Sequence, residues 1–125
     1  MVDGIAITEN RVAILLSPEK RRLVARFPDG GPEYDRQLQA AREASLNELI
    51  EREKLLQQHK QALAPVAAGA IDKEIQREIR ENYAGDKERF ASALVDSRMT
   101  MKGYRKLTEE KLLAEAFRPR AAKKK

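Results

Sequence analysis

A helix-forming stretch over residues 32–63 constrains the fold of this chain more than any other feature of its sequence. After its first residue it contains no Gly or Pro, and it is rich in residues that favour helix. An amphipathic helix of this length, roughly 45 Å at about 1.5 Å per residue, has to pack against another part of the chain. Its apolar face, set by three-, four- and seven-residue spacings, consists of Leu38, Leu46, Leu49, Ile50, Leu55, Leu56 and Leu63.

A second helical pattern follows over residues 70–101, where apolar side chains recur every four positions at Ile71, Ile75, Ile79 and Tyr83. This stretch is as long as the first one, and a segment with Pro and Gly separates the two. We therefore predict an antiparallel helical hairpin over residues 32–101. Gly85 leaves open a kink or a break in the second arm, after which Asp86 would cap a new turn.

The first 31 residues have a different texture. Runs of β-favouring residues at 5–8, 11–16 and 21–27 are separated by segments of turn length. We predict that residues 1–31 form a small β-meander packed on the hairpin, because an isolated meander is marginal in water. The alternative is a short helix over residues 18–27, with Ser17 as its N-cap.

The carboxyl end, residues 102–118, is predicted to contain a short helix from Glu109 to Phe117 with Thr108 as its N-cap. Residues 119–125 then form a disordered basic tail. The predicted fold class is therefore mainly α, or α+β if the meander forms.

Composition excludes several kinds of chemistry. The chain has no cysteine, so it forms no disulfide and has no thiol nucleophile. Its one histidine, His59, has no nucleophile near it in sequence and is interpreted as an exposed structural side chain. Acidic residues such as Glu48 and Glu74 have arginines three or four positions away, which is typical of ion pairs on an exposed helix face. We predict a protein that is not an enzyme, with no cofactor and no metal site.

No apolar run approaches the roughly 18 residues that a bilayer-spanning helix needs. The amino end carries an acidic residue and no basic group before its first apolar residues, unlike a secretory signal. We therefore expect a cytoplasmic protein without a membrane partner.

The net charge of +5 is concentrated at the carboxyl end, since residues 102–125 alone carry a net charge of +6. A second basic group lies near residues 20–26. If the two groups converged, they would neutralise phosphates without reading sequence, with Tyr104 stacking on a base. The leading hypothesis is thus a non-enzymatic protein that binds DNA or RNA in a salt-sensitive manner. The candidate contacts are Lys20, Arg21, Arg22, Arg26, Lys102, Tyr104, Arg105, Lys106, Arg118, Arg120, Lys123, Lys124 and Lys125.

The alternative is an adaptor or inhibitor that binds a protein partner through the apolar stripe of the hairpin. The candidate contacts for such a partner are Leu46, Leu49, Leu56 and Leu63. Their partial heptad also leaves a homodimeric coiled coil open. Charged residues at Glu53 and Lys60 are unfavourable in a parallel seam, so an intramolecular core is the preferred reading.

Overall fold

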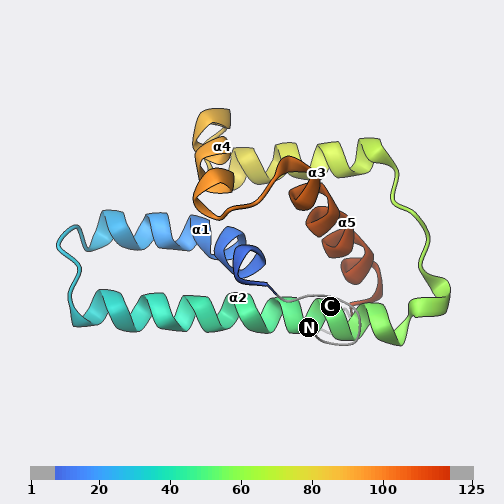
Figure 1. The fold of residues 1–125 in the computed structure, drawn as a ribbon, viewed down its shortest axis with the longest axis horizontal. Helices are drawn as coiled ribbons and strands as arrows, with labels where there is room; N and C mark the ends of the chain where they lie inside the picture. The colour runs from blue at the N-terminus through green and yellow to red at the C-terminus, as the bar shows by residue number, and fades with distance from the viewer. Residues whose placement is uncertain (1–7, 119–125) are drawn as a thin grey trace, which may run out of the picture.

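The structure is a computed structural model that describes residues 8–118. This part of the chain is built from five α-helices and one short 3-10 helix, and it contains no strand (Figure 1). The elements are α1 (Glu9–Arg26), α2 (Pro32–Gln58), η1 (Lys60–Ala62), α3 (Ala68–Asn82), α4 (Lys87–Asp96) and α5 (Met101–Phe117). The predicted mainly α class is confirmed. The tail predicted at residues 119–125 lies outside the described residues.

The predicted amino-terminal β-meander is wrong, because residues 9–26 form the continuous helix α1. The shorter helix weighed as an alternative also begins too late, since Pro18 lies inside α1, whose ribbon changes direction about midway (Figure 1). Three alternate residues, Val12, Ile14 and Leu16, are buried. Such burial is possible in a helix because α1 packs against both α2 and α4. Because α1 is contacted on more than one side, its buried residues alternate along residues 12–16, as they would in a strand.

The long helix pairs with α1, and not with residues 70–101 as predicted. The most extensive helix–helix contact is between α1 and α2, which lie side by side in Figure 1. The turn between them contains Gly30 and Gly31, whose φ angles of 72° and 108° suit residues without a Cβ. Pro32 then begins α2 at a position where a missing N–H costs nothing. The predicted hairpin between equal arms is therefore replaced by a hairpin of α1 and α2.

The second predicted arm is broken near Gly85, where the sequence left open either a kink or a break. Helix α3 ends at Asn82, and Ala84 and Gly85 follow with φ angles of 55° and 76°. The prediction that Asp86 caps a new turn is confirmed, since its Oδ1 accepts hydrogen bonds from the backbone N–H groups of Glu88 and Arg89.

Helix α5 begins earlier than predicted. Its N-cap is Thr100, whose hydroxyl accepts a hydrogen bond from the N–H of Gly103 at 2.9 Å. The predicted cap, Thr108, is instead buried within the helix, where its hydroxyl donates to the carbonyl of Tyr104. Because α5 starts at Met101, it is long enough to contact both α2 and α3. It therefore packs against two helices that lie far from it in sequence.

The main apolar core lies where α1, α2, α3, α4 and α5 meet. The four residues that predicted the apolar face of α3 are all buried in it, together with Phe90, Leu94 and Met99 of the following segment. A smaller cluster of Leu55, Leu56 and Ala114 fastens the end of α2 to α5. Among residues 8–118, no helix has both the length and the apolar character that crossing a membrane requires.

Candidate functional site

A cavity of about 380 Å³ opens between α1, α2, α3 and α5. Its volume falls within the roughly 300–1,000 Å³ of small-ligand and side-chain pockets. The apolar part of its lining consists of Ile14, Leu15, Pro18, Tyr83, Tyr104 and Leu107. The polar part includes Arg22, Ser45, Glu48, Arg52, Asn82 and Lys111. An apolar floor with a polar rim is the usual composition of a binding site.

Aromatic packing holds the floor of the cavity. The ring of Phe90 lies edge-on to the rings of both tyrosines, at 5.5 Å from Tyr83 and 5.0 Å from Tyr104. Burial raises the pKa of both tyrosine hydroxyls above its ordinary value. Both rings therefore present neutral hydroxyl groups to the cavity throughout the physiological pH range.

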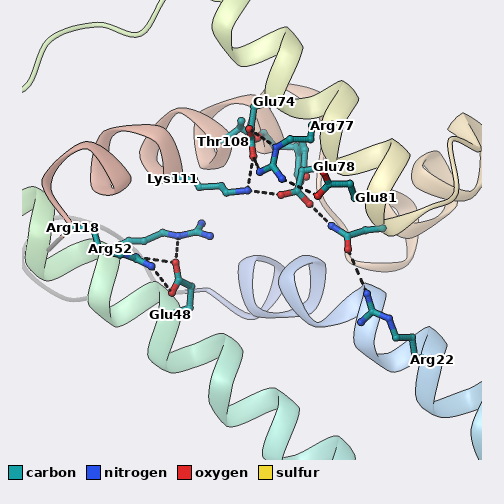
Figure 2. A network of polar contacts seen from close by, with 12 residues as sticks. Arg22, Glu48, Arg52, Glu74, Arg77, Glu78, Glu81, Thr108, Lys111 and Arg118 are labelled. Carbon is teal, nitrogen blue, oxygen red and sulfur yellow. Dashed lines mark hydrogen bonds and ion pairs between the residues drawn. The ribbon is translucent and has the colours of Figure 1, made fainter. Parts of the chain in front are cut away.

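The wall formed by α2 contributes one carboxylate and one guanidinium, Glu48 and Arg52, to the lining of the cavity. Glu48 accepts hydrogen bonds from Arg52 Nε at 2.8 Å and from Arg118 Nη2 at 3.0 Å (Figure 2). Burial alone would raise the pKa of Glu48, but the hydrogen bonds from Arg118 and Arg52 outweigh it and hold this pKa below its ordinary value. One carboxylate thus faces two guanidinium groups.

On the opposite side, α3 and α5 share an ion-pair network with an excess of negative charge, of which Glu78 and Lys111 line the cavity. Lys111 of α5 forms ion pairs with Glu74, at 2.5 Å, and with Glu78 of α3. Arg77 pairs with Glu74 and, at 2.8 Å, with Glu81 (Figure 2). Three carboxylates therefore share two cations. Burial would lower the pKa of Lys111, but the hydrogen bonds that it donates to Glu74 and Glu78 outweigh burial and raise this pKa.

A third set of contacts joins α1 to the end of α3 at the rim. Asn82 donates to Glu78 at 2.6 Å and accepts a long hydrogen bond, 3.5 Å, from Arg22 (Figure 2). Arg22 also pairs with Glu19 at 2.7 Å. Polar side chains from all four helices thus line the cavity together with its apolar residues.

The described basic residues predicted to contact phosphate come from two helices, and several of them are engaged in ion pairs. Lys20, Arg21, Arg22 and Arg26 lie on α1, whereas Lys102, Arg105 and Lys106 lie on the first half of α5. Arg105 pairs with Asp72, Lys106 lies 3.8 Å from Glu109, and Arg118 is bound to Glu48. Tyr104 is buried and therefore cannot stack on a base. The remaining candidates, Arg120, Lys123, Lys124 and Lys125, lie outside the described residues.

The leucines predicted to contact a partner are mostly occupied within the chain. Leu49 and Leu56 are only 4% and 5% exposed, and Leu63 packs on the smaller core cluster. Leu46 is the one of the four with a largely exposed side chain, at 38%. The intramolecular use of this stripe, which the sequence favoured, is therefore what the fold shows.

Sequence reasoning missed most residues of the cavity. It found the pair of Glu48 and Arg52, but treated the acidic residues as exposed, whereas Glu74 and Arg52 are each only 9% exposed. Lys111 gave no signal, because its partners are 33 and 37 positions away. His59 is half-buried, and its ring stacks on Phe117 at 4.1 Å, away from the cavity.

The described residues do not form a cluster of metal ligands. Within residues 8–118 no three His, Asp or Glu side chains gather closely enough to hold an ion. The carboxylates that line the cavity are instead engaged by lysine and arginine. The site as built is suited to contacts with apolar and charged groups of another molecule.

Comparison with known proteins identifies a family for nearly the whole chain. Residues 1–118 match the family model described as the SurA-like N-terminal domain. No curated protein and no solved structure gave a match. Domains of this kind are helical protein-interaction domains of the chaperone and peptidyl-prolyl isomerase type.

This match corrects the leading hypothesis drawn from the sequence. Nucleic-acid binding is wrong, because a domain of this family favours a protein-interaction role, which was the alternative. The basic carboxyl end was a misleading signal, since runs of lysine occur in proteins of many kinds. The all-helical architecture agrees with the match. The chain belongs to the SurA-like N-terminal domain family.

Proposed function

We propose that this chain is a protein-interaction domain that holds a segment of a partner polypeptide in the cavity between α1, α2, α3 and α5. The observation that carries the proposal is the cavity's apolar floor within a charged rim, in a chain of the SurA-like N-terminal domain family. An apolar side chain of the partner would enter the cavity, while its backbone and polar groups would contact the rim.

The size of the cavity suits weak and reversible binding. Burying one large apolar side chain contributes about 1.5–3 kcal/mol, and part of this gain offsets the ordering of both chains. A cavity of about 380 Å³ holds one or two side chains and no folded element. Binding of this strength lets a partner segment leave and rebind, as a chaperone-type domain requires.

We also propose that the chain is not an enzyme. Glu48 and Glu74 have pKa values below the ordinary range because arginine and lysine outweigh their burial, so neither is poised as a general acid near neutral pH. His59 does not line the cavity. Cytoplasmic placement and a homodimer stay predictions, to be tested by cell fractionation and by the mass of the protein in solution.

The test compares two substitutions of alanine on the same helix. Ala44 lines the cavity, whereas Ala40 lies one turn earlier on an exposed part of α2 and does not. Ala44→Trp should fill the opening and weaken binding by about tenfold or more, which is the affinity carried by one buried side chain. Ala40→Trp should leave binding unchanged.

The probe is a permanently unfolded polypeptide, such as dye-labelled lactalbumin whose cysteines have been reduced and carbamidomethylated. Affinity is measured by fluorescence anisotropy, and circular dichroism confirms that both variants are folded. Equal affinity of the two variants would move the site away from the cavity. Absence of binding by the unmodified chain would overturn the proposed function itself.

A further inference from the structure

Arg52 is the cation best placed to meet a ligand in the cavity. It is a buried arginine, 9% exposed, in the part of α2 that lines the cavity. Its Nε donates to Glu48 at 2.8 Å, and its two Nη groups carry the other N–H donors of the guanidinium. In Figure 2 the tip of its side chain extends past Glu48 toward the middle of the polar network. A guanidinium in this position can donate to a ligand in the cavity.

Glu48 is shared between two arginines, of which Arg52 lines the cavity and Arg118 does not. Both Glu48 oxygens accept hydrogen bonds from Arg118, at 3.4 and 3.0 Å. Arg118 also lies in the field of Glu51 and Glu115, which together with Glu48 raise its pKa. Arg118 is therefore compensated by several carboxylates, and Arg52 is the one of these two arginines that lines the cavity.

The same cavity brings that charge beside an apolar surface. Arg52 shares the lining with Tyr104 and Leu107. Its charge acts on the Tyr104 hydroxyl, in the direction opposite to the burial and the nearby carboxylates that raise this pKa. A ligand group that contacts Leu107 can therefore have a neighbouring group within reach of the guanidinium.

Resting on the proposed function, we propose that the cavity selects polypeptide segments in which a carboxylate lies next to a large apolar side chain. The apolar side chain packs against Tyr104 and Leu107, and the carboxylate accepts hydrogen bonds from the Nη groups of Arg52. A planar guanidinium binds a carboxylate through two parallel hydrogen bonds, which are about twice as strong as neutral ones. On the opposite side, the ion-pair network has three carboxylates for two cations and contributes Glu78 to the lining, which disfavours a second carboxylate there.

The carboxylate has two natural sources, an acidic side chain or the free carboxyl end of a polypeptide. Two peptide series distinguish them. In the first, a blocked peptide carries Phe followed by Asp, Asn or Lys at its centre. In the second, a peptide ends in Phe with either a free carboxylate or an amide. Affinities for the unmodified chain are measured by isothermal titration calorimetry.

We expect the Asp peptide to bind about tenfold more tightly than the Asn peptide, from the strength of a charge-assisted hydrogen bond. The Lys peptide should bind most weakly of the three. A matching tenfold preference for the free carboxylate in the second series would name the chain end as a ligand, and its absence would restrict the ligand to acidic side chains.

The substitution Arg52→Gln should remove the preference for Asp over Asn while leaving the affinity for the Asn peptide within about twofold. Arg52→Lys keeps the charge but not the planar fork, and it should retain part of the preference. Arg42→Gln is the matched control, since Arg42 is also on α2 and pairs with a glutamate, Glu9, at 2.8 Å but lies outside the cavity. It should leave the preference unchanged.

Circular dichroism and thermal unfolding confirm that each variant is folded. If Arg52→Gln does not fold, the peptide series on the unmodified chain and the Arg52→Lys variant still decide. Equal binding of the Asp and Asn peptides by the unmodified chain would overturn the inference and leave the proposed function standing, whereas failure to bind any peptide or unfolded polypeptide would overturn both.

Discussion

The two sides of the cavity both contain partly buried ion pairs, but the ratio of carboxylates to cations differs between them. On the α2 wall, Glu48 is shared between two arginines. On the α3–α5 wall, Lys111 and Arg77 are shared among three glutamates. The first wall is built partly from a pair four residues apart, and the second depends on a lysine from a different helix. The comparison teaches that local pairs supply charge, while contacts between helices decide where the excess lies.

The largest expected effect is on the α3–α5 wall. Lys111→Met leaves Glu74 and Glu78 partly buried, with Arg77 as the remaining cation near Glu74, and should lower the free energy of unfolding by about 3 kcal/mol. Urea denaturation measures the change. The control is Lys106→Met, an exposed residue of the same helix that lies 3.8 Å from Glu109, where a loss of under about 0.5 kcal/mol is expected. Equal losses in both variants would remove the distinction between buried and exposed pairs.

A smaller effect is expected on the α2 wall. Glu48→Gln removes the carboxylate shared by two arginines, but its side chain is about a third exposed, so water replaces part of the interaction. The free energy of unfolding should fall by about 1–2 kcal/mol. The same change makes this wall more positive, so binding of the Asp peptide should strengthen as stability falls. A parallel loss of both would mean that Glu48 positions Arg52 for the ligand.

Stability should fall at acid pH because of Glu48 and Glu74, and at alkaline pH because of Lys111. The pKa values of Glu48 and Glu74 are below 4.5 in the folded chain, so their stabilisation is present above pH 4.5 and is lost as the pH falls through the lowered values. The pKa of Lys111 is above 10.5, so its stabilisation is complete below pH 10.5 and is lost as the pH rises through the raised value. Melting temperatures measured at about pH 2 to 12 should fall at both the acid and the alkaline end of this range.

Lys111→Met sharpens this test. The substitution should abolish the part of the alkaline loss that belongs to Lys111 and should shrink the acid loss, because Glu74 then keeps only Arg77. An alkaline limb identical to that of the unmodified chain would show that other lysines or tyrosines control it.

The smallest effect is expected far from either wall. Arg36 pairs with Glu33 at the exposed start of α2, where the two side chains are 73% and 44% exposed. Arg36→Gln should leave the melting temperature unchanged within error, since exposed pairs are screened by water and salt. A clear decrease in melting temperature would mean that exposed ion pairs on α2 stabilise the chain as much as partly buried ones. This would contradict the distinction drawn between the ion pairs beside the cavity and those in solvent.

Part of the fold could be predicted from the sequence because it depends on neighbouring residues. The four-residue spacing of Ile71, Ile75 and Ile79 predicted a buried helix face, and all three are buried. The capping role of Asp86 also needed only the backbone N–H groups that follow it. The mainly helical class follows from many such local preferences added together.

The sequence was misleading where several elements meet. Residues 11–16 looked like a strand because α1 is buried on more than one side, which removes the single apolar stripe of a surface helix. Equal lengths suggested that residues 70–101 pair with the long helix, but length does not decide which apolar faces fit together. For the cavity, the sequence supplied the pair of Glu48 and Arg52 and gave no reason to place Lys111 opposite it.

The sequence by itself determined that this chain forms helices, where α2 and α4 begin, and which local charges pair. The tertiary structure decided that α1 partners α2, that Arg52 and Glu74 are buried, and that a cavity with unequal walls lies between the helices. The physical reason is range: capping and periodicity act within one or two helical turns. Burial and the balance of charge depend on side chains brought together from helices that are tens of residues apart in sequence.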